Sequence, residues 1–220
     1  MTITLPTRRF AALLFDMDGT LISSIASAER TWSRWAAAHG LDVATFLPTI
    51  HGVRSVETIR RLNLPGVDPE AEAAAITRAE MEDVGDVTEI PGARAFLATL
   101  PPDRWAIVTS APRGLARRRL EAADMPTPTL MIAAEDVAQG KPAPDCFLLA
   151  ARRLEIAAAE CCVFEDAPAG IRAAEAAGAS LVVVTATHHE PAPTGHPAIA
   201  DYRRLRAVAD PDGIRLTTEH

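Results

Sequence analysis

Two aspartates, Asp16 and Asp18, follow the first strongly apolar segment of the chain, residues 11–15. Side chains two positions apart in an extended chain point to the same side, so both carboxylates face one way as long as the chain stays extended. Gly19 then permits a tight turn, because glycine adopts backbone conformations that other residues avoid. The spacing therefore predicts a pair of carboxylates presented together at the end of a buried strand.

Other groups capable of chemistry stand in the same position, after an apolar segment. A hydroxyl pair follows the second segment, a lysine follows the third at the start of a predicted helix, and two carboxylates follow the fourth. In open parallel α/β sheets the carboxyl ends of the strands meet at one edge, and that edge holds the ligand. We therefore expect these side chains to converge with Asp16 and Asp18: Thr109, Ser110, Lys141, Glu165 and Asp166.

Bringing Asp16, Asp18 and Asp166 together has an electrostatic cost. Like charges repel and burial adds a desolvation penalty, so the cluster would cost several kcal/mol unless a cation lay among the carboxylates. Ligand sets made only of oxygen, without His or Cys, fit Mg²⁺, which also accepts a substrate phosphate among its ligands. The sequence therefore predicts a magnesium site that binds a phosphoryl group.

Five short apolar segments have the composition of fully buried parallel strands: residues 11–15, 105–109, 129–133, 161–164 and 181–185. Ala-rich and Arg-rich stretches with helical spacing separate the last four. Alternation of buried strands with helices is typical of a parallel sheet that carries helices on both faces. The predicted fold class is therefore α/β, with a Rossmann-like, doubly wound parallel sheet.

About ninety residues separate the first two of these strands, far more than one connection needs. This segment reads as almost entirely helical, with helices predicted at 27–39, at 55–62 and from Asp68, where Pro69 suits the first helical position. We expect residues 22–89 to form a helical-bundle cap, inserted into a core domain of residues 1–21 and 90–220. Segments 206–209 and 214–217 flank a turn and predict a terminal hairpin.

The composition disfavours several classes of function. The formal net charge of −7 disfavours binding to a nucleic-acid backbone. No apolar run is long enough to span a bilayer, and no apolar signal segment follows the first basic residues, so we expect a cytoplasmic protein without membrane contact. The three cysteines lack metal-binding spacing and are predicted to be reduced. No protein partner is indicated.

Four segments together resemble the motifs of the haloacid dehalogenase superfamily of phosphatases: FDMDGTL at 15–21, IVTSAP at 107–112, GKPAPDCF at 140–147 and VFEDAPAGIRAAEAAG at 163–178. The resemblance covers the whole chain, including a helical cap after the first motif. More narrowly, LISSIASAERTW, IHGVRS and WAIVTSAP are similar to segments of bacterial sugar or polyol phosphatases and of yeast deoxyglucose-6-phosphate and glycerol-3-phosphate phosphatases. The resemblance implies hydrolysis of small phosphorylated sugars or polyols.

The resemblance also implies roles for the residues that match the motifs. Asp16 would be the nucleophile that forms an aspartyl phosphate, and Asp18 would protonate the leaving group and then activate water. The Asp16 carboxylate, the Asp18 backbone carbonyl and the Asp166 carboxylate would hold Mg²⁺.

The same resemblance assigns the phosphate-binding groups. Thr109 would hydrogen-bond a phosphoryl oxygen, with Ser110 beside it, although an isolated threonine after a strand is more often a helix cap. Lys141 would neutralise charge on the phosphate and on Asp16. It is the only lysine among 22 Lys and Arg residues, and a compact ammonium suits a place between a carboxylate and a phosphate better than a broad guanidinium.

For three residues the sequence supports two interpretations. His51 and Arg54 lie in a loop between two predicted cap helices; similar loops of related phosphatases contact substrate, and the alternative is an ordinary connection with a surface arginine. Glu165 is either an outer partner of the metal site or a surface group, since strand alternation aims it away from Asp166.

Other aromatic and imidazole groups have simpler expectations. Trp32, Trp35 and Ile25, at helical spacing, are expected in the core of the cap. His188, His189 and His196 are expected on a solvated, Pro-rich loop.

Departures from the family pattern favour simple hydrolysis. Many members have Asp where this chain has Ser23, and the sugar phosphomutases carry His where it has Ala28. The presence of Asp18 argues against a haloacid dehalogenase, which lacks this acid/base group. The alternatives are a sugar phosphomutase and, from another class, a receiver-like phospho-acceptor or a sugar-phosphate binding module.

Overall fold

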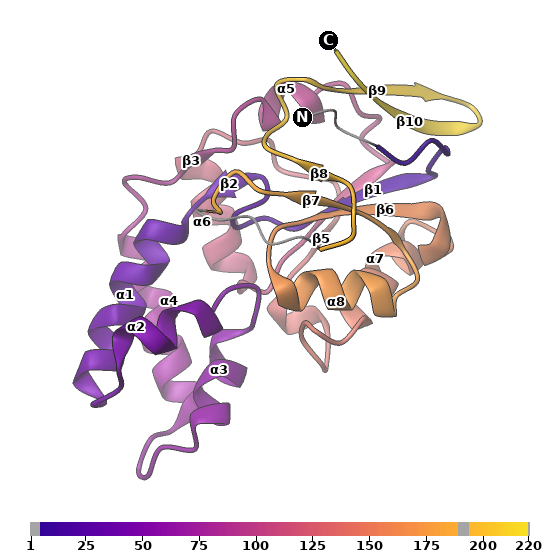
Figure 1. The fold of residues 1–220 in the computed structure, drawn as a ribbon. Helices are drawn as coiled ribbons and strands as arrows, with labels where there is room; N and C mark the ends of the chain where they lie inside the picture. Colours follow the sequence, from indigo (N-terminus) through magenta and orange to yellow (C-terminus); the bar gives the residue numbers. More distant parts are fainter. Residues whose placement is uncertain (1–4, 189–193, 220) are drawn as a thin grey trace.

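The computed structural model describes residues 5–188 and 194–219. Its centre is a parallel sheet of six strands, in the order β5, β4, β1, β6, β7, β8 (Figure 1). All five pairings in this sheet are parallel. In sheet order, the strands are Met131–Ile132, Trp105–Val108, Ala12–Phe15, Cys161–Glu165, Ser180–Val184 and Ala198–Ile199. Because their carboxyl ends share one edge, the residues that follow them lie close together.

Strand β1 shows why the sheet is covered on both faces. Its four residues are all buried, and successive side chains point to opposite faces. Leu13 and Phe15 join one apolar cluster, which includes residues of helices α5 (Ala93–Leu97) and α6 (Arg113–Ala122). Ala12 and Leu14 join the other, with helices α7 (Asp145–Arg153) and α8 (Pro168–Ala176). This is the predicted doubly wound α/β fold, and it is confirmed.

The five predicted strands are all present, with two differences. Strand β5 has only two residues, whereas five were expected at 129–133. A sixth strand, β8, pairs with β7 through Val183 and Val184 and was not predicted. Two residues after a Pro-rich loop are too short a segment to show a periodicity.

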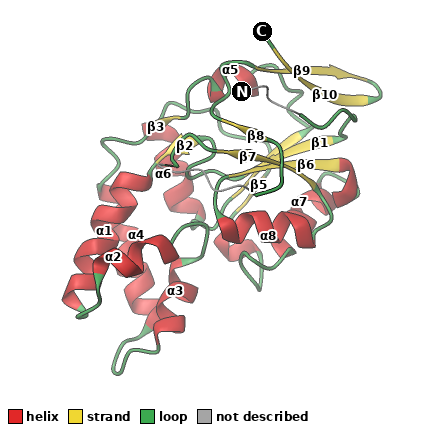
Figure 2. Cartoon of the chain, in the orientation of Figure 1, coloured by secondary structure: helices red, strands yellow, loops and turns green. Residues whose placement is uncertain are grey.

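The segment between the first two core strands contains helices α1 (Ile25–Ala38), α2 (Val43–Phe46), α3 (Ser55–Leu62) and α4 (Pro69–Glu82). Figure 2 shows these helices gathered beside the sheet. Helix α4 begins as expected: the Asp68 carboxylate accepts hydrogen bonds from two backbone N–H groups and Pro69 is the first helical residue. Trp32 and Trp35 are buried in the apolar cluster of these helices, as predicted, whereas Ile25 is only half-buried and does not belong to that cluster.

The chain leaves the core for these helices and returns to it at one place. Strand β2 (Ile22–Ser23) pairs antiparallel with strand β3 (Thr88–Glu89), so the outgoing and returning segments lie side by side. This short ribbon places α1 and α4 next to the end of β1, where Asp16 and Asp18 stand.

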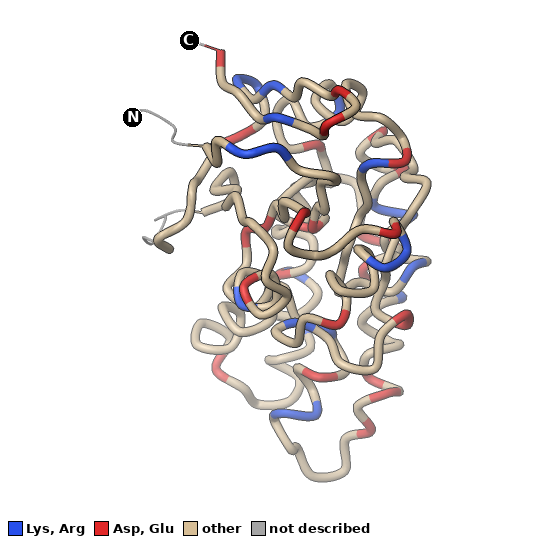
Figure 3. The backbone as a smooth tube through the Cα atoms, turned by 90° about the vertical axis from the view of Figure 1, so that its right-hand side faces the viewer, with Lys and Arg blue, Asp and Glu red and all other residues tan. Residues whose placement is uncertain are grey.

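The C-terminal segment forms the expected hairpin. Strands β9 (Leu205–Asp210) and β10 (Gly213–Thr218) pair antiparallel, and Ile214 also bridges to Phe10. Figure 3 shows acidic and basic residues intermixed along the molecule. Within the described part of the chain, no helix is long and apolar enough to cross a membrane, and the three cysteines are free and buried.

Candidate active site

A pocket at the carboxyl edge of the sheet brings together groups from several strand ends. The core side of its wall includes Asp16 and Asp18 after β1, and Thr109 and Ser110 after β4. Other lining residues come from the helical segment: Ser24, Ile25, Ala28, Trp32, Ile50, His51, Gly52, Val53, Ser55 and Glu80. Four of the sequence-predicted strand-end residues, those that follow β1 and β4, therefore face a pocket between the sheet and the helices.

Lys141 lies directly behind Asp16. Its Nζ donates hydrogen bonds to Asp16 Oδ1 at 2.6 Å, to Glu165 Oε1 at 2.8 Å and to the backbone oxygen of Val108 at 3.1 Å. The side chain of Lys141 has no exposed surface. The three acceptors match the three donors of the ammonium group, so its position is fixed on every side.

The sequence left the place of Glu165 undecided. It is fully buried, so the surface interpretation is wrong. Its Oε1 accepts from Lys141, and its Oε2 accepts from the backbone N–H groups of Asp166 and Ala167, both at 2.7 Å. Gly170 makes room for it, since a Cβ there would lie 1.5 Å from Glu165 Oε1. Glu165 thus anchors Lys141.

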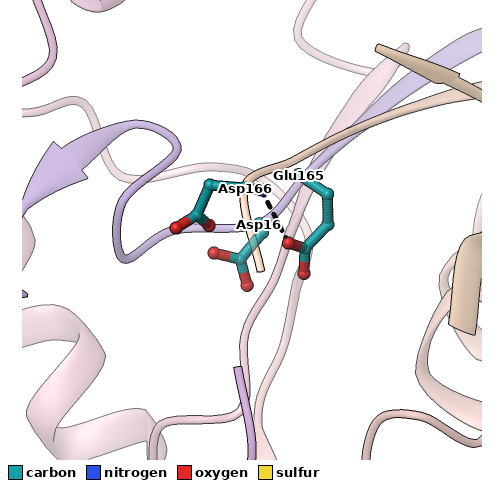
Figure 4. Close-up of side chains that lie close together, drawn as sticks. All are labelled: Asp16, Glu165 and Asp166. Atoms are coloured by element: carbon teal, nitrogen blue, oxygen red, sulfur yellow. Dashed lines mark hydrogen bonds between the residues drawn. The ribbon is translucent and has the colours of Figure 1, made fainter. Parts of the chain in front are cut away.

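Asp16, Glu165 and Asp166 form an acidic cluster at the ends of β1 and β6 (Figure 4). One carboxylate oxygen from each residue lies within 4.8 Å of the others. Asp166 Oδ1 also accepts from the Thr20 hydroxyl at 3.1 Å. Gly19 has a φ of +87°, and a Cβ there would stand 2.1 Å from Asp166 Oδ2. Glycine is therefore required at this turn both by its conformation and by the closeness of the carboxylate.

Burial of these carboxylates makes their charged forms costly. Burial raises the pKa of Asp16 to about 8, although Lys141 works in the opposite direction. Burial, with the charges of Glu165 and Asp16, also raises the pKa of Asp166. For Lys141, burial alone would lower the pKa, but the Asp16 and Glu165 carboxylates outweigh it and raise the pKa above its ordinary value.

These residues fit a bound metal ion. Three carboxylates lie together and a single ammonium group pairs with two of them, Asp16 and Glu165, so a divalent cation among the carboxylates would offset their repulsion. A donor set made only of carboxylate and backbone oxygens suits a hard cation. Glu165 already uses both oxygens in hydrogen bonds, which leaves Asp16 and Asp166 as the carboxylates available to a metal.

Asp18 faces the pocket but stands apart from this acidic cluster. Its Oδ1 accepts from the Ser24 hydroxyl at 2.5 Å and from Arg119 Nη1 at 2.9 Å. Arg119 is a site residue that the sequence reasoning missed. It lies on α6, 101 residues from Asp18, and nothing in its helical surroundings distinguishes it from the other arginines of that helix.

Comparison of the sequence with known proteins places this arrangement of strand-end residues in a known family. Residues 10–178 match the family described as haloacid dehalogenase-like hydrolase. The chain belongs to this family. It is 40% identical over 187 residues to hexitol phosphatase A of Escherichia coli, covering 83% of this chain and 87% of the relative. It is 32% identical over 196 residues to 2-deoxyglucose-6-phosphate phosphatase 1 of Saccharomyces cerevisiae, covering 80% of each.

A solved structure supports the same membership. A hydrolase from Pseudomonas syringae superposes on this chain with a TM-score of 0.73 at 26% identity, covering 82% of this chain and 87% of that one. The family resemblance read from the four motifs is confirmed.

In this haloacid dehalogenase-like hydrolase, Thr109 and Ser110 have different partners. Thr109 is buried and its Oγ1 accepts from the Ala111 N–H at 3.0 Å, which leaves its own proton free for another acceptor. Ser110 lines the pocket, but its hydroxyl donates to the backbone oxygen of Gly52 at 2.9 Å. Ser110 thereby connects the core to the loop that carries His51.

His51 and Arg54, the two loop residues considered for substrate binding, have different surroundings in the structure. His51 lines the pocket, with Nε2 3.3 Å from Glu29 Oε1, and burial lowers its pKa although Glu29 opposes this. Arg54 does not belong to the pocket wall. Its guanidinium pairs with Glu57 and donates to backbone oxygens of the 134–138 segment. The expectation that Arg54 contacts substrate is therefore corrected: its charge pairs with Glu57, and its Nη1 and Nη2 groups join the start of α3 to the 134–138 segment. Its buried Nε has no hydrogen-bond partner among the described residues.

The loop histidines of this hydrolase also have contacts. His188 Nε2 lies 3.0 Å from the backbone oxygen of Asp166, and His196 Nε2 lies 2.8 Å from Glu175. His188 and His196 are therefore not simply solvated, as the loop composition had suggested. His189 lies outside the described residues.

Proposed function

We propose that this hydrolase is a Mg²⁺-dependent phosphatase that releases inorganic phosphate from small phosphorylated sugars or polyols. One observation carries the proposal: a buried Asp16 carboxylate faces the pocket with the Lys141 ammonium 2.6 Å behind it and Asp18 on the same pocket wall. A nucleophile, a fixed positive charge and an acid/base group are what hydrolysis through a covalent intermediate needs. The names of the relatives, which are phosphatases of hexitol and deoxyglucose phosphates, support the same class of substrate.

The first step uses Asp16 and Asp18. A carboxylate oxygen of Asp16 attacks phosphorus, and the bond from phosphorus to the leaving oxygen breaks. Asp18 gives its proton to that oxygen, which departs as an alcohol. The product on the enzyme is an aspartyl phosphate at Asp16.

The second step restores both residues. Asp18, now a carboxylate, takes a proton from a water molecule that attacks the aspartyl phosphate at phosphorus. The bond between phosphorus and the Asp16 oxygen breaks, and inorganic phosphate leaves. Asp16 is again a carboxylate and Asp18 again carries a proton.

Other residues balance charge and orient the phosphoryl group. The Asp16 and Asp166 carboxylates and the Asp18 backbone carbonyl would hold Mg²⁺, which would supply positive charge that offsets the negative charge of the phosphoryl group. Lys141 adds a preorganised positive charge that Glu165 keeps in place. The free proton of the Thr109 hydroxyl donates to a phosphoryl oxygen.

In this proposal residues 22–89 are the cap over a core of residues 1–21 and 90–220, and the cap encloses the leaving group. Ile25, Trp32 and His51 supply its side of the pocket wall. Ala28 also lines the pocket, at the position where the sugar phosphomutases carry His. A methyl group there favours hydrolysis over transfer of the phosphoryl group within a sugar.

Phosphate release from a panel of hexose, hexitol and glycerol phosphates tests the proposal, with Mg²⁺ present or removed by a chelator. We expect turnover of at least one polyol or sugar phosphate, loss of turnover without Mg²⁺, and loss of turnover in Asp16→Asn. Asp103→Asn, at an exposed position, is the control for an aspartate substitution and should match the wild type. Unchanged turnover by Asp16→Asn would contradict the proposed nucleophile.

A further inference from the structure

Two charged residues of the pocket wall are used by no step above: Glu80 on helix α4 and Arg119 on helix α6. Each has only 5% of its surface exposed. Burial of a charged side chain is costly unless the charge is paired and its hydrogen bonds are made. Their presence in the wall of a catalytic pocket therefore needs a reason.

The hydrogen bonds of Arg119 are incomplete. Its Nη1 donates to Asp18 Oδ1 at 2.9 Å. Its Nη2 lies 3.4 Å from Glu80 Oε1, close enough for charge pairing but without a hydrogen bond. Nη2 and Nε have no hydrogen-bond partner in the part of the chain that the structure describes. Arg119 therefore presents unused donors beside an acceptor, the Glu80 carboxylate.

The position of this pair relative to Asp18 indicates which part of a substrate it would meet. In the proposed mechanism Asp18 protonates the leaving oxygen, so groups beyond Asp18 on the cap side face the leaving alcohol and not the phosphoryl group. Arg119 contacts Asp18 directly, and Glu80 comes from the cap. Ile25, Trp32 and Leu115 line the same pocket and offer apolar surface to carbon atoms.

We infer that Glu80 and Arg119 select the substrate by binding a hydroxyl group of the leaving alcohol. A hydroxyl both donates and accepts, so one such group accepts from Arg119 and donates to Glu80, which completes the hydrogen bonds of both side chains. This inference rests on the proposed phosphatase function and adds to it the residues that recognise the polyol.

The charges of the pair also exclude a class of substrate. Asp18 is neutral while it holds the proton for the leaving oxygen, and Glu80 alone then balances the positive charge of Arg119. A leaving group with a carboxylate would therefore meet the negative charge of Glu80 without an unmatched cation to receive it. Neutral hydroxylated leaving groups are favoured, and phosphorylated hydroxy acids are disfavoured.

Three esters with the same number of carbon atoms test the inference: glycerol 1-phosphate, n-propyl phosphate, which lacks the hydroxyls, and 3-phosphoglycerate, which carries a carboxylate. We expect Glu80→Ala to lower kcat/KM for glycerol 1-phosphate by about tenfold or more, because a hydrogen bond to a charged group is lost. Its kcat/KM for n-propyl phosphate and p-nitrophenyl phosphate, which offer no such hydroxyl, should fall by a smaller factor, so that the ratio of kcat/KM for glycerol 1-phosphate to that for n-propyl phosphate decreases by about threefold or more. Glu80→Gln removes only the charge and should raise kcat/KM for 3-phosphoglycerate relative to glycerol 1-phosphate.

Glu82→Gln is the matched control, since Glu82 is an exposed residue of the same helix, and it should leave all four rates unchanged. An equal loss with hydroxylated and unhydroxylated esters in both Glu80 variants would show a structural role and overturn the inference alone. Absence of turnover by the wild type with every ester, p-nitrophenyl phosphate included, would instead overturn the proposed function and the inference together. If Glu80→Ala fails to fold, the near-isosteric Glu80→Gln tests the inference. An unchanged ratio of kcat/KM for 3-phosphoglycerate to kcat/KM for glycerol 1-phosphate in this variant would overturn it.

Discussion

Lys141 is enclosed so tightly that its shape matters as much as its charge. The ammonium contacts three oxygen acceptors at 2.6 to 3.1 Å, and the Phe147 ring lies 5.1 Å from Nζ to its centroid. A guanidinium is planar and wider, so it keeps the charge but cannot occupy the same point between Asp16 and Glu165. The single lysine of the chain thus stands where arginine would fit poorly.

We expect Lys141→Arg to lower kcat for phosphate release by about a hundredfold or more, the size of effect seen when a preorganised electrostatic group is displaced. Arg117→Lys, the reverse change at an exposed position, should leave kcat unchanged. Steady-state kinetics measure both, and circular dichroism checks that each variant is folded. A wild-type rate in Lys141→Arg would mean that only the charge is needed.

Glu80 makes stability depend on pH. Burial, opposed by Arg119, raises the pKa of Glu80 from an ordinary value of 4.5 to about 7. Between these two values the folded protein holds a proton that the unfolded chain has lost, so its free energy of unfolding decreases as pH rises through that window. Glu80→Gln has no such proton. Its stability relative to the wild type should therefore increase by up to about 3 kcal/mol between pH 4.5 and 7.

Urea denaturation at several pH values measures this difference, with Glu82→Gln as the exposed control on the same helix. A stability difference between Glu80→Gln and the wild type that stays constant across the window would contradict the assigned pKa.

Three of the site residues that the sequence predicted, Asp16, Thr109 and Asp166, share one property: each follows a buried strand. That position alone brings Asp16, Thr109 and Asp166 to the edge of the sheet. Arg119 could not be found this way, because its contact with Asp18 joins segments 101 residues apart and depends on the packing of α6. Arg54 was misassigned for a related reason, since a sequence does not show that backbone oxygens of the 134–138 segment use its donors.

At the scale of the elements, helix α8 and strand β6 must approach closely to hold Glu165. Gly170 lies in α8, and its missing Cβ leaves the space that the Glu165 carboxylate occupies. Alanine is a better helix former than glycine, so propensity alone would favour Gly170→Ala. Sterics reverse this expectation, because the new Cβ would lie 1.5 Å from Glu165 Oε1.

We expect Gly170→Ala to push the Glu165 carboxylate away from Lys141 and to lower both kcat and the thermal midpoint of unfolding. Gly114→Ala is the matched control, because Gly114 lies in helix α6 and a Cβ added there would meet no neighbouring atom within 4 Å. This control variant should be more stable than the wild type by about 0.5–1 kcal/mol, without loss of activity. Equal behaviour of the two variants would contradict the role given to the close approach.

Elements marked by local signals were predictable, and elements fixed by distant contacts were not. The start of α4 was readable because Asp68 and Pro69 act within one helical turn. Strand β8 has only two residues and is defined by its pairing with β7. No local sequence pattern predicts it. The short helix α2 was likewise missed, although its side chain Phe46 packs against Trp32 and Trp35.

At the scale of the whole molecule, the acidic cluster that would bind the metal also lowers the stability of the folded protein. Asp16, Glu165 and Asp166 are buried together with one ammonium group between two of them. Such a cluster destabilises the folded chain unless a cation binds to it. A ligand that binds only the folded state stabilises that state by about 2.7 kcal/mol when its concentration is a hundred times its Kd.

We therefore expect Mg²⁺ to raise the thermal midpoint of unfolding, and Asp166→Asn to abolish most of that rise, because the variant removes one negative charge and one ligand oxygen from the cluster. The metal-free Asp166→Asn protein should also be more stable than the metal-free wild type, since its repulsion is smaller. Differential scanning calorimetry at constant ionic strength separates binding from screening, with Asp103→Asn as the exposed control. A rise in the midpoint that is the same in the wild type and in Asp166→Asn would place the metal elsewhere. The opposite signs expected for Asp166→Asn, more stable without Mg²⁺ and less stabilised by it, distinguish a metal ligand from an aspartate that only supports the fold.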